Sequence, residues 1–261
     1  TQIAQVRNNV RMENRTITLS TDSLNYDRVA NLGYFFDGGT LMDEENVLTS
    51  SWGEYSPATK VSVFNYDVKL VNPQFVLTSD TLRYNTETKI ANIVGPSDIE
   101  SDENHIYSEL GFYHTQLGQA ELLKRSILVN GGKKLTGDSL FYDRNKGYGE
   151  AFSQVELVDT INKNMLTGNY CYYNQMTSYA LATDKAMATD FSQQDSMFVH
   201  GDTLQLVTFN LDTDSVYREI RAFHKVRIYR QDVQGVCDSL VFSSKDSCLT
   251  MFRDPILWNG R

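Results

Sequence analysis

A repeat of about 29 residues is the feature that most limits how this chain can fold. An anchor residue, followed four positions later by tyrosine or an apolar residue, recurs eight times. A unit of this length cannot bury its own apolar face, so neighbouring units must stack on one another. The steps between anchors are 29, 29, 29, 29, 31, 33 and 36 residues, and the anchors are Asp22, Ser51, Asp80, Glu109, Asp138, Asn169, Asp202 and Asp238.

Each unit has the sequence pattern of a β-hairpin. An alternating segment such as residues 82–84 is followed by a polar turn at 85–88 and a β-branched stretch at 90–94. Alternation bounded by Asn, Asp and Gly turns is typical of antiparallel hairpins. Eight units predict an all-β fold, an elongated antiparallel β-jellyroll of about sixteen strands whose sheet folds over its apolar face. Residues 119–126 have some helical character, but the repeat register predicts strand there.

The inward face of this sheet is predicted from the repeated Asp-Ser/Thr-Leu-x-Tyr motif. Side chains alternate between the two faces of a strand, so Leu and Tyr share one face. Periodicity leaves two alternatives open for that face, a dry closed core or two walls separated by an apolar groove. The candidate groove-lining residues are Leu24, Tyr26, Leu82, Tyr84, Leu140, Tyr142, Leu204, Leu206, Leu240 and Phe242.

Charge and composition exclude several classes of protein. The 261-residue chain has a net charge of −9 and a pI of about 4.9. An acidic surface repels phosphate backbones, so we expect no nucleic-acid partner. No run of 18 apolar residues occurs, and no transmembrane helix is expected. Without a Pro- or Ser-rich linker, we predict an N-terminal segment at residues 1–13 and a single repeat domain over residues 14–261.

Catalytic and metal-binding chemistry is not predicted. The acidic anchors recur once per unit, whereas catalytic carboxylates normally form one unique pair, so we assign them to hydrogen bonding at turns or strand entries. No Gly-x-Ser-x-Gly elbow is present, and the four histidines have no metal-ligand spacing. We predict no enzymatic activity, no metal and no cofactor.

Three cysteines leave one question open. Cys171, Cys237 and Cys248 form no Cys-x-x-Cys pair. Cys237 and Cys248 are close enough in sequence to bridge neighbouring strands in an oxidising compartment. Three semi-buried thiols are the other interpretation.

The motif Gly-Asp-Ser/Thr-Leu-x-Tyr-Asp, as at residues 137–143, resembles the OstA-like family of lipopolysaccharide-transport proteins of Gram-negative bacteria. The segment at residues 253–260 is similar to an Asp-Pro-x-x-Trp sequence that often precedes a further repeat in that family, which suggests a chain truncated before additional repeats. The resemblance extends from about Asn14 onward. Units two and four depart from it, because Gly53 and Gly111 replace the motif leucine.

The resemblance implies a twisted β-jellyroll, open along one edge, that binds the acyl chains of lipopolysaccharide (lipid A). Such a protein would carry lipid through the periplasm toward the outer membrane, with which it could associate. The implied partners are lipopolysaccharide or another acylated lipid, and other jellyroll-containing transport proteins that pair through edge strands, including head-to-tail copies of this chain.

Two other functions remain open from the residues alone. A structural or adhesive cell-surface β-repeat protein would use the same inward columns as a closed core. A carbohydrate-active enzyme on a β-helix would require a unique carboxylate cluster, which the repeated acidic anchors do not provide. Lengthening steps and two turn signals per unit favour antiparallel hairpins over the constant rungs of a solenoid.

Overall fold

The computed structural model describes residues 2–14, 17–101 and 104–259. Within these ranges the regular elements are all β-strands, and the strand pairs of each unit are antiparallel. The chain divides into two compact units, Thr1–Ser126 (unit 1) and Ile127–Arg261 (unit 2). The all-β antiparallel fold class is therefore confirmed. The prediction of a segment 1–13 before a single domain 14–261 stays a prediction, and residues 1, 15–16, 102–103 and 260–261 of it lie outside the described residues.

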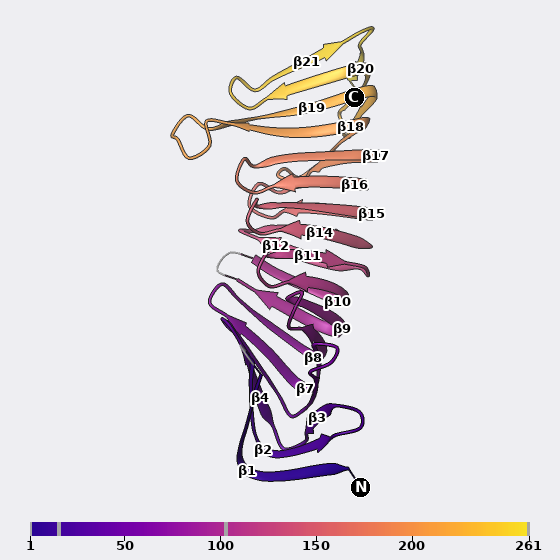
Figure 1. The fold of residues 1–261 in the computed structure, drawn as a ribbon. Helices are drawn as coiled ribbons and strands as arrows, with labels where there is room; N and C mark the ends of the chain where they lie inside the picture. Colours follow the sequence, from indigo (N-terminus) through magenta and orange to yellow (C-terminus); the bar gives the residue numbers. More distant parts are fainter. Residues whose placement is uncertain (1, 15–16, 102–103, 260–261) are drawn as a thin grey trace. The chain divides into compact units, whose positions relative to one another are not determined.

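Unit 1 is an antiparallel meander (Figure 1, indigo to magenta) in which β2 pairs with both β3 and β4, and β7 pairs with both β5 and β6. Residues 119–126, which the repeat register predicted as strand, are indeed extended at both ends. The strands are β1 (Ile3–Asn14), β2 (Ile17–Asp27), β3 (Leu32–Phe35), β4 (Gly39–Asp43), β5 (Asn46–Ser50), β6 (Trp52–Ser56), β7 (Val61–Asn72), β8 (Phe75–Asn85), β9 (Ile90–Glu100), β10 (Asn104–His114) and β11 (Gln119–Leu122).

Unit 2 continues the same pattern of hairpins. Its final strands, β21 and β22, are largely exposed and pair with the two halves of β20. The strands are β12 (Ser126–Asn130), β13 (Lys133–Gly137), β14 (Ser139–Asp143), β15 (Tyr148–Asp159), β16 (Asn164–Asn174), β17 (Tyr179–Asp190), β18 (Met197–Phe209), β19 (Tyr217–Tyr229), β20 (Val233–Ser243), β21 (Cys248–Phe252) and β22 (Ile256–Asn259).

Most strands bend at mid-length, and this bend folds the sheet over. In β7 the register against β8 shifts between Asn65 and Val68, where Tyr66 (φ 65°) and Asp67 (φ 54°) are both left-handed. In β17, Asp184 and Lys185 are likewise both left-handed, and the register against β16 shifts there. Such bulges bend a strand sharply. Some predicted long strands are split completely at the bend, for example into β13 and β14, so the strand segments outnumber the sixteen predicted.

The acidic anchors lie at these bends, which corrects their predicted placement at turns or strand entries. Asp22 is exposed in the middle of β2, and its Oδ1 accepts the backbone N–H of Asn9 at 3.3 Å. In the same way Ser51 donates its hydroxyl hydrogen to Asp67 (3.4 Å). The physical reason is that a bulge frees backbone and side-chain groups in mid-strand, and a short polar side chain on the neighbouring strand can satisfy them.

The bend gives each unit two walls. The wall that carries the Leu-x-Tyr half of the motif is called the tyrosine wall, and the other half of each strand forms the opposite wall. In unit 1, Phe35, Tyr55, Phe64, Leu82 and Tyr84 of the tyrosine wall are buried together with Leu41, Leu48, Leu70 and Leu77 of the opposite wall. Alternation of buried and less buried residues along β5 and β7 is the pattern that one-sided burial produces.

Candidate functional site

The interior of unit 2 contains an apolar cavity of about 100 Å³, called the unit 2 cavity. One water molecule needs roughly 10–15 Å³ by the same measure, so the space can hold several ligand atoms. Both walls contribute to it: Leu204, Leu206 and Ile220 come from the tyrosine wall. The opposite wall supplies Leu157, Leu166, Ala188, Met197 and Val199.

Small side chains on β17 leave room for the cavity. The inward positions of this strand are Ala180, Ala182, Ala186 and Ala188, and the first and last of them line the space. The inward positions of β9 in unit 1 include the larger Ile93 and Ile99. Protein interiors are close-packed, so a row of missing methyl and methylene groups leaves a void unless the walls approach each other. This alternating alanine row is the sequence signal that could have located the cavity.

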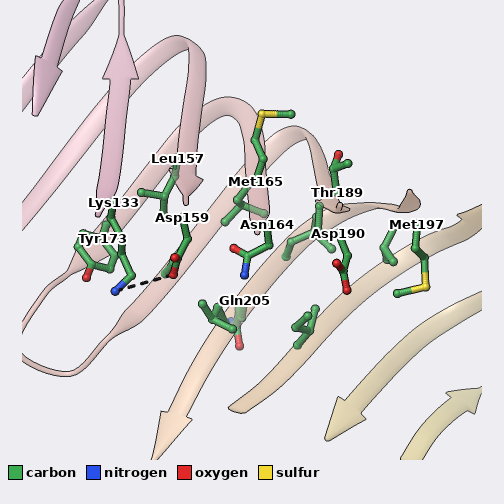
Figure 2. Close-up of a pocket in the computed structure, with 17 residues that line it drawn as sticks. Lys133, Leu157, Asp159, Asn164, Met165, Tyr173, Thr189, Asp190, Met197 and Gln205 are labelled. Carbon is green, nitrogen blue, oxygen red and sulfur yellow. Dashed lines mark ion pairs between the residues drawn. The ribbon is translucent and has the colours of Figure 1, made fainter. Parts of the chain in front are cut away.

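A row of polar side chains lies at the strand ends beside the cavity. Cross-strand pairing places Lys133, Asp159, Asn164 and Asp190 in succession, each on the next strand, followed by Met197. Figure 2 shows the carboxylates of Asp159 and Asp190 and the amide of Asn164 on the same side of these strands. The cavity is therefore apolar inside and polar at this edge, which is called its mouth.

The two carboxylates of the mouth also close hairpin turns. Asp159 accepts the backbone N–H groups of Ile161 (3.1 Å) and Asn162 (2.8 Å), and Asp190 accepts that of Ser192 (2.8 Å). Aspartate commonly stabilises turns in this way. Turn formation therefore accounts for an aspartate at each position, and it leaves both carboxylate charges at the mouth.

The predicted groove residues divide into three groups. Leu204 and Leu206 line the unit 2 cavity, and Tyr142 lines a separate space of about 10 Å³ beside Tyr173. The others are packed without contributing to the larger cavity: Leu24, Leu82, Tyr84, Leu140 and Leu240 are buried, while Tyr26 and Phe242 are partly buried. A lipid-binding role for all ten stays a prediction. Motif-based reasoning missed the cavity residues of the opposite wall, because the motif lies on the tyrosine wall.

The interior of unit 1 contains a buried ion pair. Nζ of Lys89 lies 2.7 Å from both carboxylate oxygens of Asp43, and both residues are at least nine-tenths buried. The Tyr84 hydroxyl donates to Oδ2 of Asp43 (2.8 Å) and accepts from Nδ2 of Asn46 (3.1 Å). Nδ2 of Asn72 in turn donates to Oδ1 of Asn46 (3.1 Å). These five residues are called the polar plug.

The polar plug links the two walls of unit 1, since Tyr84 belongs to the tyrosine wall and Asp43 ends β4 in the opposite wall. Burial, followed by the charge of Asp43, raises the pKa of Tyr84 above its ordinary value. The phenol therefore keeps its proton and remains a donor at physiological pH. A buried charge is tolerated only when it is paired and hydrogen-bonded, and this arrangement supplies both.

The cysteines are free thiols. Cys248 lies opposite Ser243 in the β20–β21 pair, so it does not face Cys237, and the bridge left open by the sequence is not formed. Burial raises the pKa of the Cys171 thiol to about 12, which keeps it protonated and unreactive. Among the described residues no group of three His, Cys, Asp or Glu side chains could hold a metal ion. The same part of the chain contains no helix that could cross a membrane.

A folded-over antiparallel sheet with an apolar cavity between its walls defines a β-jellyroll protein with a candidate binding site for an apolar ligand. A model of the OstA-like protein family matches residues 1–80 and 84–195, and the chain belongs to this family. Family membership supports a function of the lipopolysaccharide-transport type in general, that is, transport and binding rather than catalysis.

Two solved structures show weaker similarity. One is LptH from Pseudomonas aeruginosa, described as the LptA-homologous periplasmic component of the lipopolysaccharide transport device. Its sequence identity to this chain is 13%, the match covers 49% of this chain and 95% of that chain, and the TM-score is 0.41. The other is the WD40 domain of SCAP from fission yeast, with 10% identity, 98% and 86% coverage and a TM-score of 0.15. At these TM-scores neither supports a conclusion about this chain. No curated protein matches the sequence.

Proposed function

We propose that the unit 2 cavity binds an acyl chain of lipopolysaccharide or of another acylated lipid, and that the protein carries this lipid through the periplasm toward the outer membrane. The observation that carries the proposal is an apolar cavity inside a protein of the OstA-like family. Transport of this kind requires binding and release and no chemical step. The alternative of a structural repeat protein would need no such space.

The geometry supports an acyl chain as the ligand. Leu157, Leu166, Leu204, Leu206 and Ile220 offer apolar contacts from both walls. Each methylene moved from water into such surroundings contributes about 0.8 kcal/mol, so even a partly inserted chain of six carbons gains about 5 kcal/mol. The head group would remain at the polar mouth, in contact with water.

The cavity can widen when a ligand enters. Met197 lies at the mouth and is only partly buried. Methionine is unbranched and changes its rotamer easily, so it adapts to ligands of different size. Entry of more carbons than the empty cavity holds therefore needs side-chain movement before it needs movement of the walls.

Pairing with other transport proteins through edge strands is part of the same proposal. In unit 1, β1 pairs with β2 and is exposed over most of its length. In unit 2, β22 pairs with the first half of β20 and is exposed throughout. Exposed strands of this kind can add a strand from a partner jellyroll or from a second copy of this chain.

The test is a substitution that fills the cavity without adding charge. We expect Leu206→Trp to reduce binding of lipid A by at least about tenfold, because the indole occupies the space of the acyl chain. Native mass spectrometry with added lipid A measures the bound fraction. The matched control is Leu249→Trp, since Leu249 is an exposed leucine of unit 2 on β21 outside the cavity.

The outcomes separate the two functions. A lipid adduct on the wild type and on Leu249→Trp that disappears with Leu206→Trp supports the carrier. Absence of any adduct on the folded wild-type protein contradicts it and favours a structural role. A lipid adduct that persists on Leu206→Trp would show that the lipid binds outside the unit 2 cavity.

A further inference from the structure

Polar groups at the mouth of the unit 2 cavity fall into two parts. On one side, Nζ of Lys133 lies 4.0 Å from Asp159 and 5.4 Å from the ring centre of Tyr173. Oδ2 of Asp159 accepts from Nδ2 of Asn162 (2.7 Å), whose Oδ1 accepts from Nη1 of Arg218 (3.2 Å). Lys133, which lines the cavity, therefore has protein partners, and Arg218 reaches Asp159 through Asn162. The contacts to Tyr173 and Arg218 join the two walls.

On the other side, Asp190 carries a charge that no cation of the described residues pairs with. The only hydrogen bond of its side chain among these residues is the one that Oδ1 accepts from the backbone N–H of Ser192. Its cross-strand neighbours are Asn164 and Met197, and Gln205 lines the cavity from the tyrosine wall. The carboxylate thus lies beside uncharged cross-strand neighbours at the edge of an apolar space.

This arrangement is complementary to a hydrogen-bond donor. An ionised carboxylate only accepts hydrogen bonds, and bonds to a charged donor are about twice as strong as bonds between neutral groups. A phosphate monoester carries about −1.5 to −2 charges at pH 7 and would be repelled at the same position. The net charge of −9 on the protein also repels a phosphate, and it does so over a longer range.

We propose that Asp190 makes the unit 2 cavity selective for acyl lipids whose head group presents a donor, a protonated amine or a hydroxyl, next to the chain, over lipids that present a phosphate there. This selectivity rests on the proposed function, since it concerns the ligand of the same cavity. Asp190 acts as a specificity-determining residue, and Asn164 and Gln205 are uncharged residues of the same lining whose amides can accept and donate hydrogen bonds.

The experiment compares three ligands with the same 12-carbon chain, each below its micellar concentration: dodecylamine, dodecyl maltoside and dodecyl phosphate. Isothermal titration calorimetry at pH 7 on the full chain gives each dissociation constant. We expect the wild type to bind the amine and the maltoside about tenfold more tightly than the phosphate. A difference of this size is expected because the first two ligands gain one hydrogen bond to a charged group, whereas the phosphate is repelled. We expect Asp190→Asn to remove most of this difference.

A matched variant separates local recognition from net charge. Asp184→Asn removes the same charge from the same strand, at the exposed bend of β17 and outside the cavity lining. It should leave the selectivity at the wild-type ratio. A loss of selectivity in Asp184→Asn equal to that in Asp190→Asn would show that overall charge, not Asp190, decides, and would overturn the inference.

Other results are equally decisive. Binding of dodecyl phosphate as tight as that of the other two ligands would place the head group on Lys133 and Arg218 and overturn the inference while leaving an acyl-binding cavity. Absence of binding for all three ligands would contradict the proposed function itself. The two failures are therefore distinguishable in one set of titrations.

Discussion

Unit 1 and unit 2 are built from the same repeat, yet their interiors are filled in different ways. Unit 1 places Tyr55, Tyr84 and Phe64 between its walls and adds the buried Lys89–Asp43 pair. Unit 2 places four alanines on β17 and keeps a cavity of about 100 Å³. The difference teaches that the repeat determines which face of a strand is inside, while side-chain volume determines whether that interior is core or binding space.

The polar plug makes the contrast sharper. An acyl chain that entered beside Lys89 and Asp43 would have to separate a desolvated ion pair, which costs several kcal/mol. The polar plug thus opposes the entry of lipid at this point of unit 1. The proposed function accordingly assigns lipid binding to the unit 2 cavity.

The largest expected effect comes from removing one member of the buried pair. Asp43→Ala leaves the buried Lys89 ammonium with the half-exposed Glu44 carboxylate, 3.5 Å away, in place of its buried partner, and should destabilise unit 1 by up to about 3–5 kcal/mol. Urea unfolding followed by fluorescence of Trp52, which lies in unit 1, measures the change. Asp80→Ala, at an exposed position of β8, is the control and should stay within about 0.5 kcal/mol of the wild type. Equal effects of the two substitutions would contradict the role assigned to the plug.

A pair of identical substitutions tests the difference in packing directly. Ala91→Leu in β9 adds volume to a fully buried position of unit 1 and should destabilise it by about 1–3 kcal/mol. Ala188→Leu fills part of the unit 2 cavity and should stabilise unit 2 by about 0.5–2 kcal/mol while it weakens lipid binding. Thermal unfolding of both variants gives the signs. Destabilisation of the same size at both sites would mean that the cavity has no usable space.

The smallest effect concerns pH. The pKa of Tyr84 is raised in the folded state, so its contribution to stability is complete below pH 10, the ordinary pKa of tyrosine, and is lost as pH rises toward the folded value. The wild-type unit 1 should therefore lose stability above pH 10. The Tyr84→Phe variant should be less stable than the wild type by about 1–2 kcal/mol at pH 7, and its stability should fall less between pH 7 and pH 11. Urea midpoints at pH 7, 10 and 11 measure this. A wild-type midpoint that falls no more than that of Tyr84→Phe would contradict the assignment.

Much of the fold could be predicted from particular residues. The equal spacing of Asp22, Ser51, Asp80 and Glu109 identified the hairpin repeat, and the Leu-x-Tyr motif identified Leu82, Tyr84 and Leu140 as interior positions. Family membership followed from the same motif. Local alternation is sufficient for these conclusions because the two-residue period of a strand fixes which side chains share a face.

The candidate site was predicted only in part. Leu204 and Leu206 line the cavity, but the alanine row of β17 and the mouth residue Asp190 carry no repeated motif and were not identified. Mid-strand bends at pairs such as Tyr66–Asp67 were missed for a similar reason, since left-handed conformations at residues other than glycine have a weak sequence signal.

The sequence by itself determined that the chain forms antiparallel hairpins, which side chains point inward, and the family to which it belongs. Only the tertiary structure decided that Lys89 meets Asp43, 46 positions earlier, and that the alanines of β17 leave a cavity. The physical reason is that alternation is a property of one strand. The space between two walls depends on the summed volumes and charges of side chains from several strands, and these meet only after the sheet has bent.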